Sequence, residues 1–244
     1  MQNDFIFQNR TAAENIPVVM KEVFRYAGIP VKEISSLDDE TKKLAETAVE
    51  KIRSVMNPKA CYVRFDVKIK NNNSLFDTTS QFDATSQPAD ISNDNISSNT
   101  RPVITFSKYK IESKDLAANL KDCNSIYLFA ATLGAAVDKE IQKASRINPA
   151  LAVMLQAAGA MFIESYCDTL QNELLEEEKK DSGEFVPRYS PGYGDVPLEN
   201  QKIFFEVLQC EKNLGLTLTD SLLMMPEKSV TAFIGIKSSS LHSN

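Results

Sequence analysis

Histidine is nearly absent from this chain of 244 residues. The only histidine, His242, lies close to the carboxyl end. Catalysis by a Ser–His or Cys–His pair requires an imidazole that shares a proton with the nucleophile inside a folded site. Chain ends are usually poorly ordered. The sequence therefore disfavours enzymes that depend on such a pair.

Cysteine is scarce and dispersed. The chain has four cysteines, each more than 40 positions from the next: Cys61, Cys123, Cys167 and Cys210. No CxxC pair offers the clustered ligands of a zinc site, and nothing indicates the secreted setting that favours disulfides. We therefore expect reduced, mostly buried thiols and no metal site.

Basic residues do not predominate, since 27 Lys and Arg stand against 33 Asp and Glu and the pI is about 5.0. Without a basic surface for a phosphate backbone, we expect no nucleic acid partner. The amino-terminal MQNDFIFQNR lacks the regions of a secretory signal, which indicates a cytoplasmic protein. The most apolar run, residues 151–163, is short for a membrane span and contains Gln156, so we expect a buried helix and no membrane partner.

Hydrophobic periodicity predicts helices and strands in an irregular order. The expected helices are residues 16–28, 37–56, 112–123, 135–145, 148–180 and 199–215, with Ser113 as an N-cap. The expected strands are residues 60–70, 102–107, 125–134, 221–226 and 229–236. Because the elements do not alternate as βαβ units, the sequence favours an α+β fold, and one domain over residues 1–244 is the simplest organisation.

Two of the expected strands are separated by a low-complexity segment, residues 71–101, which contains the near repeats FDTTSQ and FDATSQ. It is rich in Asn, Ser, Asp and Thr and offers too little apolar surface to offset the entropy of ordering. We predict a disordered insertion that acts as a passive loop, with a recognition role as the alternative.

Proline and glycine, rare elsewhere, are concentrated in VPRYSPGYGDVPL, residues 186–198, which we expect to be a loop between two helices. Gly192 and Gly194 permit positive φ and a close approach of ligand to main chain. Arg188 could hold a carboxylate in its fork, and Tyr193 adds an aromatic face. This chemistry predicts a binding site for a small carboxylate-bearing molecule.

The alternative for the same stretch is a rigid structural loop in which Arg188 pairs with Asp195 or Glu184. A dinucleotide site is not supported, because a GxGxxG pattern fails at Pro197 and no GK[ST] follows.

Residues 188–230 resemble the carboxy-terminal half of the reactivation domain of cobalamin-dependent methionine synthase. The shared elements are Arg-x-x-Pro-Gly-Tyr, a helix ending in Glu-Lys-x-x-Gly, then Leu-Thr-[Asp/Glu]-Ser, Met-x-Pro and Ser-Val. The segments SKDLAANLKDC and LFAATLGAAVD are similar to the short stand-alone members of that family. The resemblance extends over roughly residues 17–236 apart from the insertion, and it implies a mostly antiparallel sheet flanked by helices.

The resemblance also implies a site and a function. Members of the family bind S-adenosylmethionine (SAM) through the Arg-x-x-Pro-Gly-Tyr loop, which corresponds to Arg188, Pro191, Gly192 and Tyr193. They restore methylcobalamin from inactive cob(II)alamin with the methyl group of SAM and an electron, commonly from flavodoxin. A tyrosine pair and an amino-terminal aspartate that also contact SAM in the long synthase have no counterpart that we can assign.

The resemblance therefore implies a SAM-binding reactivation partner, without catalytic residues of its own, for a methionine synthase that lacks this domain. The cobalamin-binding modules of such synthases use the histidine of an Asp-x-His-x-x-Gly motif as the lower ligand of cobalamin, and this chain has no such motif. Cobalamin is therefore expected on the partner chain only. Three alternatives remain: the same role for another corrinoid methyltransferase, an adaptor that has lost SAM binding, and a hydrolase using Cys167 or the pair Glu164 and Asp168.

Overall fold

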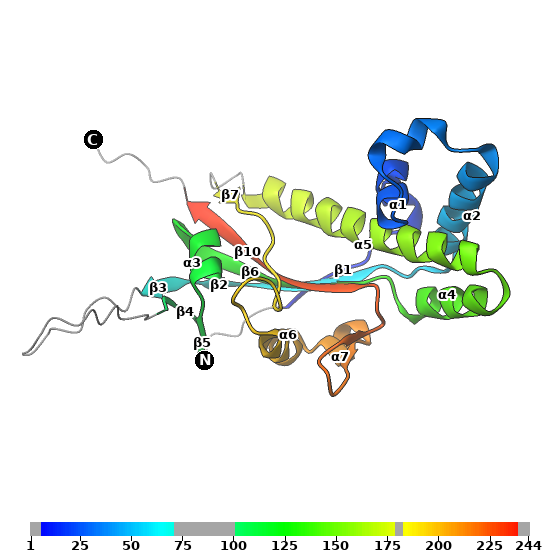
Figure 1. The fold of residues 1–244 in the computed structure, drawn as a ribbon. Helices are drawn as coiled ribbons and strands as arrows, with labels where there is room; N and C mark the ends of the chain where they lie inside the picture. Colours follow the sequence, from blue (N-terminus) through cyan, green and yellow to red (C-terminus); the bar gives the residue numbers. More distant parts are fainter. Residues whose placement is uncertain (1–5, 71–100, 179–182, 239–244) are drawn as a thin grey trace, which may run out of the picture.

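The computed structural model describes residues 6–70, 101–178 and 183–238. The insertion expected at 71–101 lies outside the described residues apart from Arg101, and so does His242. The described parts form a central sheet with helices on both faces (Figure 1).

The central sheet has the strand order β1-β2-β6-β10-β7, and all neighbouring strands are antiparallel. Its strands are β1 (Phe7–Asn9), β2 (Lys59–Asp66), β6 (Cys123–Thr132), β10 (Ser229–Ser238) and β7 (Gly183–Phe185). The expectation of an α+β fold with a mostly antiparallel sheet flanked by helices is confirmed.

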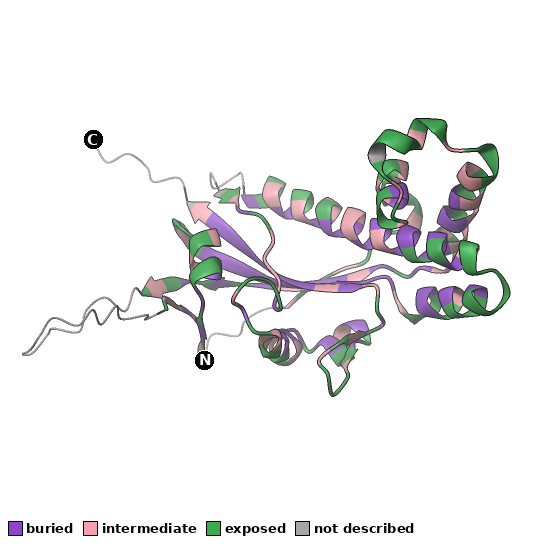
Figure 2. Cartoon of the chain, in the orientation of Figure 1, coloured by how far each residue is buried: buried purple, intermediate pink, exposed green. Residues whose placement is uncertain are grey.

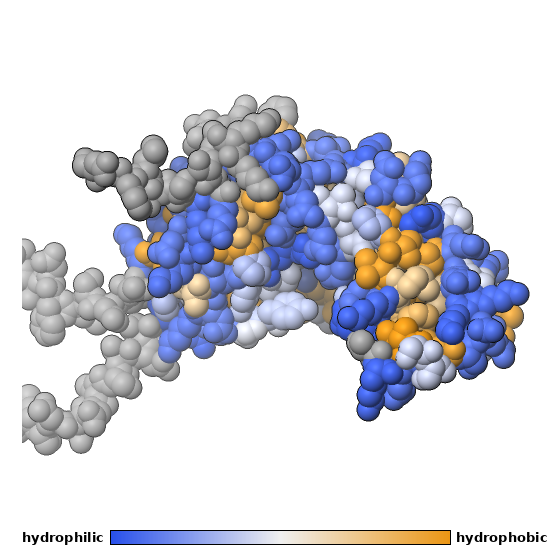
Figure 3. Space-filling view, turned by 90° about the horizontal axis from the view of Figure 1, so that it is seen from above, coloured by the Kyte–Doolittle hydropathy of each residue, from blue (hydrophilic) through white to orange (hydrophobic). Residues whose placement is uncertain are grey.

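One face of this sheet carries four helices. They are α1 (Met20–Tyr26), α2 (Asp39–Val55), α4 (Ala135–Ile147) and α5 (Pro149–Glu178), accompanied by the 3-10 turns η1 (Ala13–Asn15) and η2 (Val31–Ser36). α5 packs against the other three helices. In the view from above, apolar side chains gather at the end of the molecule that holds α1 and α2 (Figure 3).

The opposite face carries smaller elements. They are α3 (Lys114–Asn119), α6 (Gln201–Leu208), α7 (Cys210–Leu214), η4 (Leu198–Asn200), the sheet of β3 (Lys68–Lys70), β4 (Val103–Phe106) and β5 (Tyr109–Glu112), and the pair β8 (Thr217–Leu218) and β9 (Met224–Met225). The predicted N-cap of α3 is confirmed, since Ser113 Oγ accepts a hydrogen bond from the Leu116 amide at 2.9 Å.

Two apolar cores, one on each face of the sheet, explain the continuous apolar run of β6. Tyr127, Phe129 and Ala131 belong to the core under α5, and the alternate residues Ile126 and Leu128 belong to the core under α6. Because a strand alternates its faces, a strand covered on both sides reads as uninterrupted hydrophobic sequence. Figure 2 shows β6 and β10 buried along most of their length.

α5 is long and apolar enough by composition to cross a membrane, yet it lies in the protein core. In its most apolar window, 61% of the residues are buried, and its buried side chains include Phe162 and Tyr166. Such burial is typical of the core helix of a globular domain, in agreement with the buried helix expected at 151–163.

Several boundaries differ from those expected. The helix predicted over 199–215 is broken between α6 and α7 at Gln209, whose φ is +48°. The strand predicted over 60–70 divides into β2 and β3, which belong to different sheets. The short strands β1, β5 and β7 were not predicted, because strands of three or four residues carry little periodicity.

Candidate functional site

The candidate site lies where β7 covers only part of the outer edge of β10. β7 pairs with β10 at Ile236–Ser238, and the following chain stays on that edge as far as Tyr189. Tyr189 and Phe233 exchange two main-chain hydrogen bonds, of 2.9 and 2.8 Å. Beyond this bridge the loop leaves the strand, and a cavity of about 690 Å³ opens along Ser229, Val230 and Thr231.

The loop at the cavity is a compact turn. The Gly192 amide donates to the Val196 carbonyl at 2.9 Å, and the Val196 amide donates to the Tyr193 carbonyl at 3.1 Å. Gly192 and Gly194 have φ of +92° and +51°, values in the range that glycine permits. The expectation that this loop joins two helices was wrong, because β7 and the bridge at Tyr189 precede it.

Asp195 fastens the loop to the amino-terminal turn of α3. Its carboxylate accepts hydrogen bonds from the amides of Lys114, at 2.8 Å, and Asp115, at 3.2 Å, and from the hydroxyl of Ser113. In return, the Asp195 amide donates to the Asp115 carboxylate at 3.2 Å. A carboxylate at a helix amino terminus is electrostatically favourable, so this contact fixes the loop on the protein body.

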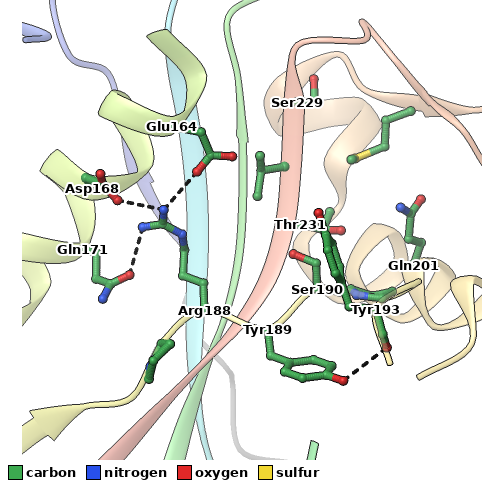
Figure 4. A pocket seen from close by; sticks show the side chains of 14 residues that line it. Glu164, Asp168, Gln171, Arg188, Tyr189, Ser190, Tyr193, Gln201, Ser229 and Thr231 are labelled. Atoms are coloured by element: carbon green, nitrogen blue, oxygen red, sulfur yellow. Dashed lines mark hydrogen bonds and ion pairs between the residues drawn. The ribbon is translucent and has the colours of Figure 1, made fainter. Parts of the chain in front are cut away.

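One wall of the cavity, which we call the ion-pair wall, consists of Arg188, Glu164, Asp168 and Gln171 (Figure 4). Arg188 donates to Asp168 at 2.7 Å, to Glu164 at 3.1 Å and to Gln171 at 3.0 Å. The two acids lie one turn apart on α5, so a single guanidinium reaches both. With one cation and two anions, this wall carries a net negative charge.

Burial shapes the electrostatics of this wall. Burial by itself would lower the pKa of Arg188, but its interactions with Cys167 and Asp168 outweigh that effect, and the pKa is raised. Arg188 is therefore a permanent cation, whose side chain is only 19% exposed. The structural pairing considered from sequence was wrong in detail, because the partners of Arg188 are Glu164 and Asp168 instead of Asp195 or Glu184.

The other wall, which we call the amide wall, consists of Gln201, Thr231, Ser229, Met224, Ser190 and Tyr193. Gln201 is the first residue of α6, and Thr231 lies on β10. Figure 4 shows the labelled side chains of this wall on the side of the cavity away from Arg188. All the charged residues that line the cavity belong to the ion-pair wall.

The family of the chain follows from its sequence. Residues 35–242 match the profile of the activation domain of vitamin B12-dependent methionine synthase. The chain belongs to this family. No curated protein matches the sequence significantly.

A solved structure shows the same fold for this activation domain. A crystal structure of the MetH reactivation domain bound to AdoHcy superposes with a TM-score of 0.60, covering 98% of this chain and 80% of that one. The two sequences are 16% identical, so this likeness concerns the fold. The resemblance inferred from the sequence motifs is confirmed by the family match.

The structure brings together most of the site residues predicted for this activation domain. Arg188, Pro191 and Tyr193 line the cavity, while Gly192 shapes the turn between them. Gln201 and Thr231 were not predicted from the sequence as site residues. Neither residue could be recognised from its neighbours, because only the packing of α6 beside the edge of β10 makes both of them face one cavity.

The hydrolase alternative gains no support from this arrangement. Cys167 is fully buried, and burial raises the pKa of its thiol, which disfavours the reactive thiolate. Glu164 and Asp168 both accept hydrogen bonds from the Arg188 guanidinium, which gives this pair of acids a structural role. Among the described residues, no cluster of three or more potential metal ligands occurs.

Proposed function

We propose that the chain binds SAM in this cavity and reactivates, in trans, a cobalamin-dependent methionine synthase that lacks its own activation domain. The observation that carries the proposal is that Arg188, Pro191 and Tyr193 line one cavity together with two carboxylates. Its volume, about 690 Å³, is in the range of small-molecule sites. The solved relative is bound to AdoHcy, which is SAM without its methyl group.

The residues of the ion-pair wall fit the amino-acid end of SAM. A guanidinium has five N–H groups, and the wall uses three of them, so two remain to donate to a carboxylate. Glu164 and Asp168 favour the ammonium and sulfonium groups. Since SAM carries a net positive charge, it complements the net negative charge of this wall.

The proposed reaction combines one cob(II)alamin, one electron and one methyl group, and it yields methylcobalamin and S-adenosylhomocysteine. Bound SAM supplies the methyl group, and a donor such as flavodoxin supplies the electron. The contribution of this chain is to hold the ligand in an orientation that replaces a bimolecular encounter with a positioned one. Tyr193 is 69% exposed and marks an open mouth through which a cofactor on a partner chain could approach.

The proposal includes a cytoplasmic location. The four cysteines are free thiols, which is consistent with a reducing compartment.

The substitution Arg188→Ala tests the proposed ligand. Losing a charge-assisted contact costs about 1.5–3 kcal/mol, which corresponds to roughly 10- to 100-fold in the affinity for SAM measured by calorimetry. The fold should survive, because the side chains of Glu164 and Asp168 are 46% and 66% exposed and water can solvate them. Arg25→Ala, at an exposed ion pair on α1, serves as the matched control and should bind SAM normally.

The same two variants then enter a reactivation assay. A cobalamin-loaded synthase without its activation domain is mixed with SAM and a mild reductant, and methylcobalamin formation is followed by visible absorbance. Wild type and Arg25→Ala should accelerate it, and Arg188→Ala should do so only at higher SAM. Acceleration with a different corrinoid protein alone would assign the same repair role to that partner. Normal SAM binding without acceleration for any corrinoid partner would contradict the proposal, and the absence of both SAM binding and acceleration would favour the adaptor that has lost SAM binding.

A further inference from the structure

Two polar atoms of the amide wall are buried without a hydrogen-bond partner among the described residues: Gln201 Oε1 and Thr231 Oγ1. Gln201 is 6% exposed and Thr231 is 2% exposed. Both line the cavity. The ion-pair wall differs in its hydrogen bonding, because each of its charged side chains has a protein partner.

Burial of an unpaired polar atom destabilises the folded protein, because the atom loses its hydrogen bonds to water and gains none in return. Most buried polar side-chain atoms in proteins are therefore paired. Of the five such unpaired atoms in the described part of the chain, the other three belong to Arg53, Asn119 and Asp138, which do not line this cavity. Two exceptions on one wall of the candidate site indicate groups that a ligand satisfies.

The edge of β10 adds main-chain groups to the same wall. Phe233 and Gly235 bond outward to Tyr189 and Val186. Because a strand alternates, the main-chain groups of Thr231 point to this same outer edge. Within the described ranges, no strand covers the edge at Thr231, since β7 pairs with β10 only from Ile236 onward.

The chemistry of the amide wall suits an uncharged, flat, polar-edged group. Gln201 Oε1 is an acceptor, and the Thr231 hydroxyl both donates and accepts. Tyr193 offers an aromatic face and Met224 a polarizable thioether, both of which pack well against a heteroaromatic ring. The charged end of a ligand is matched by the ion-pair wall on the other side of the cavity.

We propose that the amide wall recognises the adenine of the ligand, with Gln201 Oε1 accepting from the exocyclic 6-amino group and the Thr231 hydroxyl bonding to a ring nitrogen. This inference rests on the proposed binding of SAM. It assigns Gln201 and Thr231 as residues that determine base specificity, and it orients the ligand with its amino-acid end at Arg188.

The test uses the full chain with Gln201→Leu and Thr231→Val, which replace the polar atoms by apolar groups. SAM affinity should fall about 10-fold for each variant, measured by calorimetry. The melting temperature without ligand should stay the same or rise, because the substitutions remove buried unpaired polar atoms. A residue with a merely structural polar role would instead lose stability on substitution. Gln142→Leu, at an exposed position on α4, is the matched control and should change neither quantity.

Base specificity gives the decisive readout. Wild type should bind S-adenosylhomocysteine at least about 10-fold more tightly than S-inosylhomocysteine, whose base has an oxygen in place of the 6-amino group, since a site built for an N–H group discriminates against analogues that lack it. In Gln201→Leu this preference should disappear. Equal binding of the two compounds by wild type, or an unchanged preference in Gln201→Leu, would overturn the inference.

The outcomes separate this inference from the proposed function. If wild type binds SAM, Arg188→Ala weakens it and both amide-wall variants bind normally, the proposed function stands and the inference fails. If wild type does not bind SAM, the proposed function fails, and adenosine then decides the inference: binding to wild type that is lost in Gln201→Leu supports it, and no binding overturns it.

Discussion

The two walls of the cavity differ in how their polar groups are satisfied. On the ion-pair wall, Arg188 donates three hydrogen bonds to protein side chains, at distances of 2.7 to 3.1 Å. On the amide wall, Gln201 Oε1 and Thr231 Oγ1 are buried, and the described residues offer them no partner. One wall is organised by the protein alone, whereas the other is completed by what it binds.

This difference suggests a division of labour between affinity and selectivity. A prearranged set of charges orients a charged ligand without reorganisation. Buried unpaired groups contribute chiefly by rejecting ligands that cannot satisfy them. The ion-pair wall should therefore respond to the charge of a ligand, and the amide wall to the identity of its base.

Reversing the net charge of the ion-pair wall should give the largest change in ligand binding. In the double variant Glu164→Gln/Asp168→Asn, Arg188 is left as the only charge of the wall. The sulfonium of SAM then loses its favourable electrostatic interaction, whereas neutral S-adenosylhomocysteine is less affected. The ratio of the two affinities should fall about 10-fold, or about 1.4 kcal/mol, in calorimetric titrations.

A matched control for this variant is Glu46→Gln/Glu50→Gln, which neutralises two exposed acids one turn apart on α2. It should leave the ratio unchanged. If the cavity variant behaves like the control, the carboxylates act only as partners of Arg188, and the ion-pair wall does not sense ligand charge.

The predictability of the two walls from sequence also differs. Arg188, Pro191, Gly192 and Tyr193 lie within one short motif, so local chemistry and the family resemblance identify them together. Their acidic partners were considered only as a possible catalytic pair. The link between α5 and Arg188 depends on β7 returning the chain to the sheet edge, and a strand of three residues carries no recognisable pattern.

The amide wall was not predictable for a physical reason. Gln201 lies at the start of an amphipathic helix and Thr231 in a strand, where polar residues usually face solvent. Their burial follows from long-range packing, since α6 covers the face of the sheet that Phe233 occupies, with the Phe204 and Phe233 rings 4.7 Å apart. The central strands were easier to predict, because the apolar residues at 125–134 and 229–236 reflect the burial of these strands directly.

A smaller effect, on the stability of the fold, is expected from substitution of Asp195, which anchors the loop that contributes to both walls. Burial would raise the pKa of Asp195, but hydrogen bonds from Ser113 and from the amides of Lys114 and Asp115 outweigh it, and the pKa is lowered. A carboxyl group with a lowered pKa in the folded state stabilises the fold above its unfolded pKa, about 3.9, and loses this contribution as pH falls through the folded value.

Asp195→Asn should therefore be less stable than wild type at pH 7, by about 0.3–1 kcal/mol, as expected for a charge at a helix amino terminus. The difference should shrink as pH falls through the lowered folded-state pKa of Asp195, because the protonated carboxyl group is neutral like the asparagine amide. Urea unfolding at several pH values measures it. A difference that is constant with pH would show that shape, rather than charge, accounts for the contact.

Replacing residues 71–100, for which the sequence predicts a passive insertion, should have the smallest effect on SAM binding and on stability. The flanking strands β3 and β4 pair directly, with Lys70 opposite Val103, so a short turn can join them. Replacing the segment should leave SAM affinity unchanged and the melting temperature unchanged or slightly raised, because a shorter loop has a lower closure entropy. As a control, a longer excision that removes β4 should destabilise the fold, since Ile104 and Phe106 are buried. A loss of several degrees with the short turn, or weaker SAM binding, would instead give the insertion a role in the folded protein.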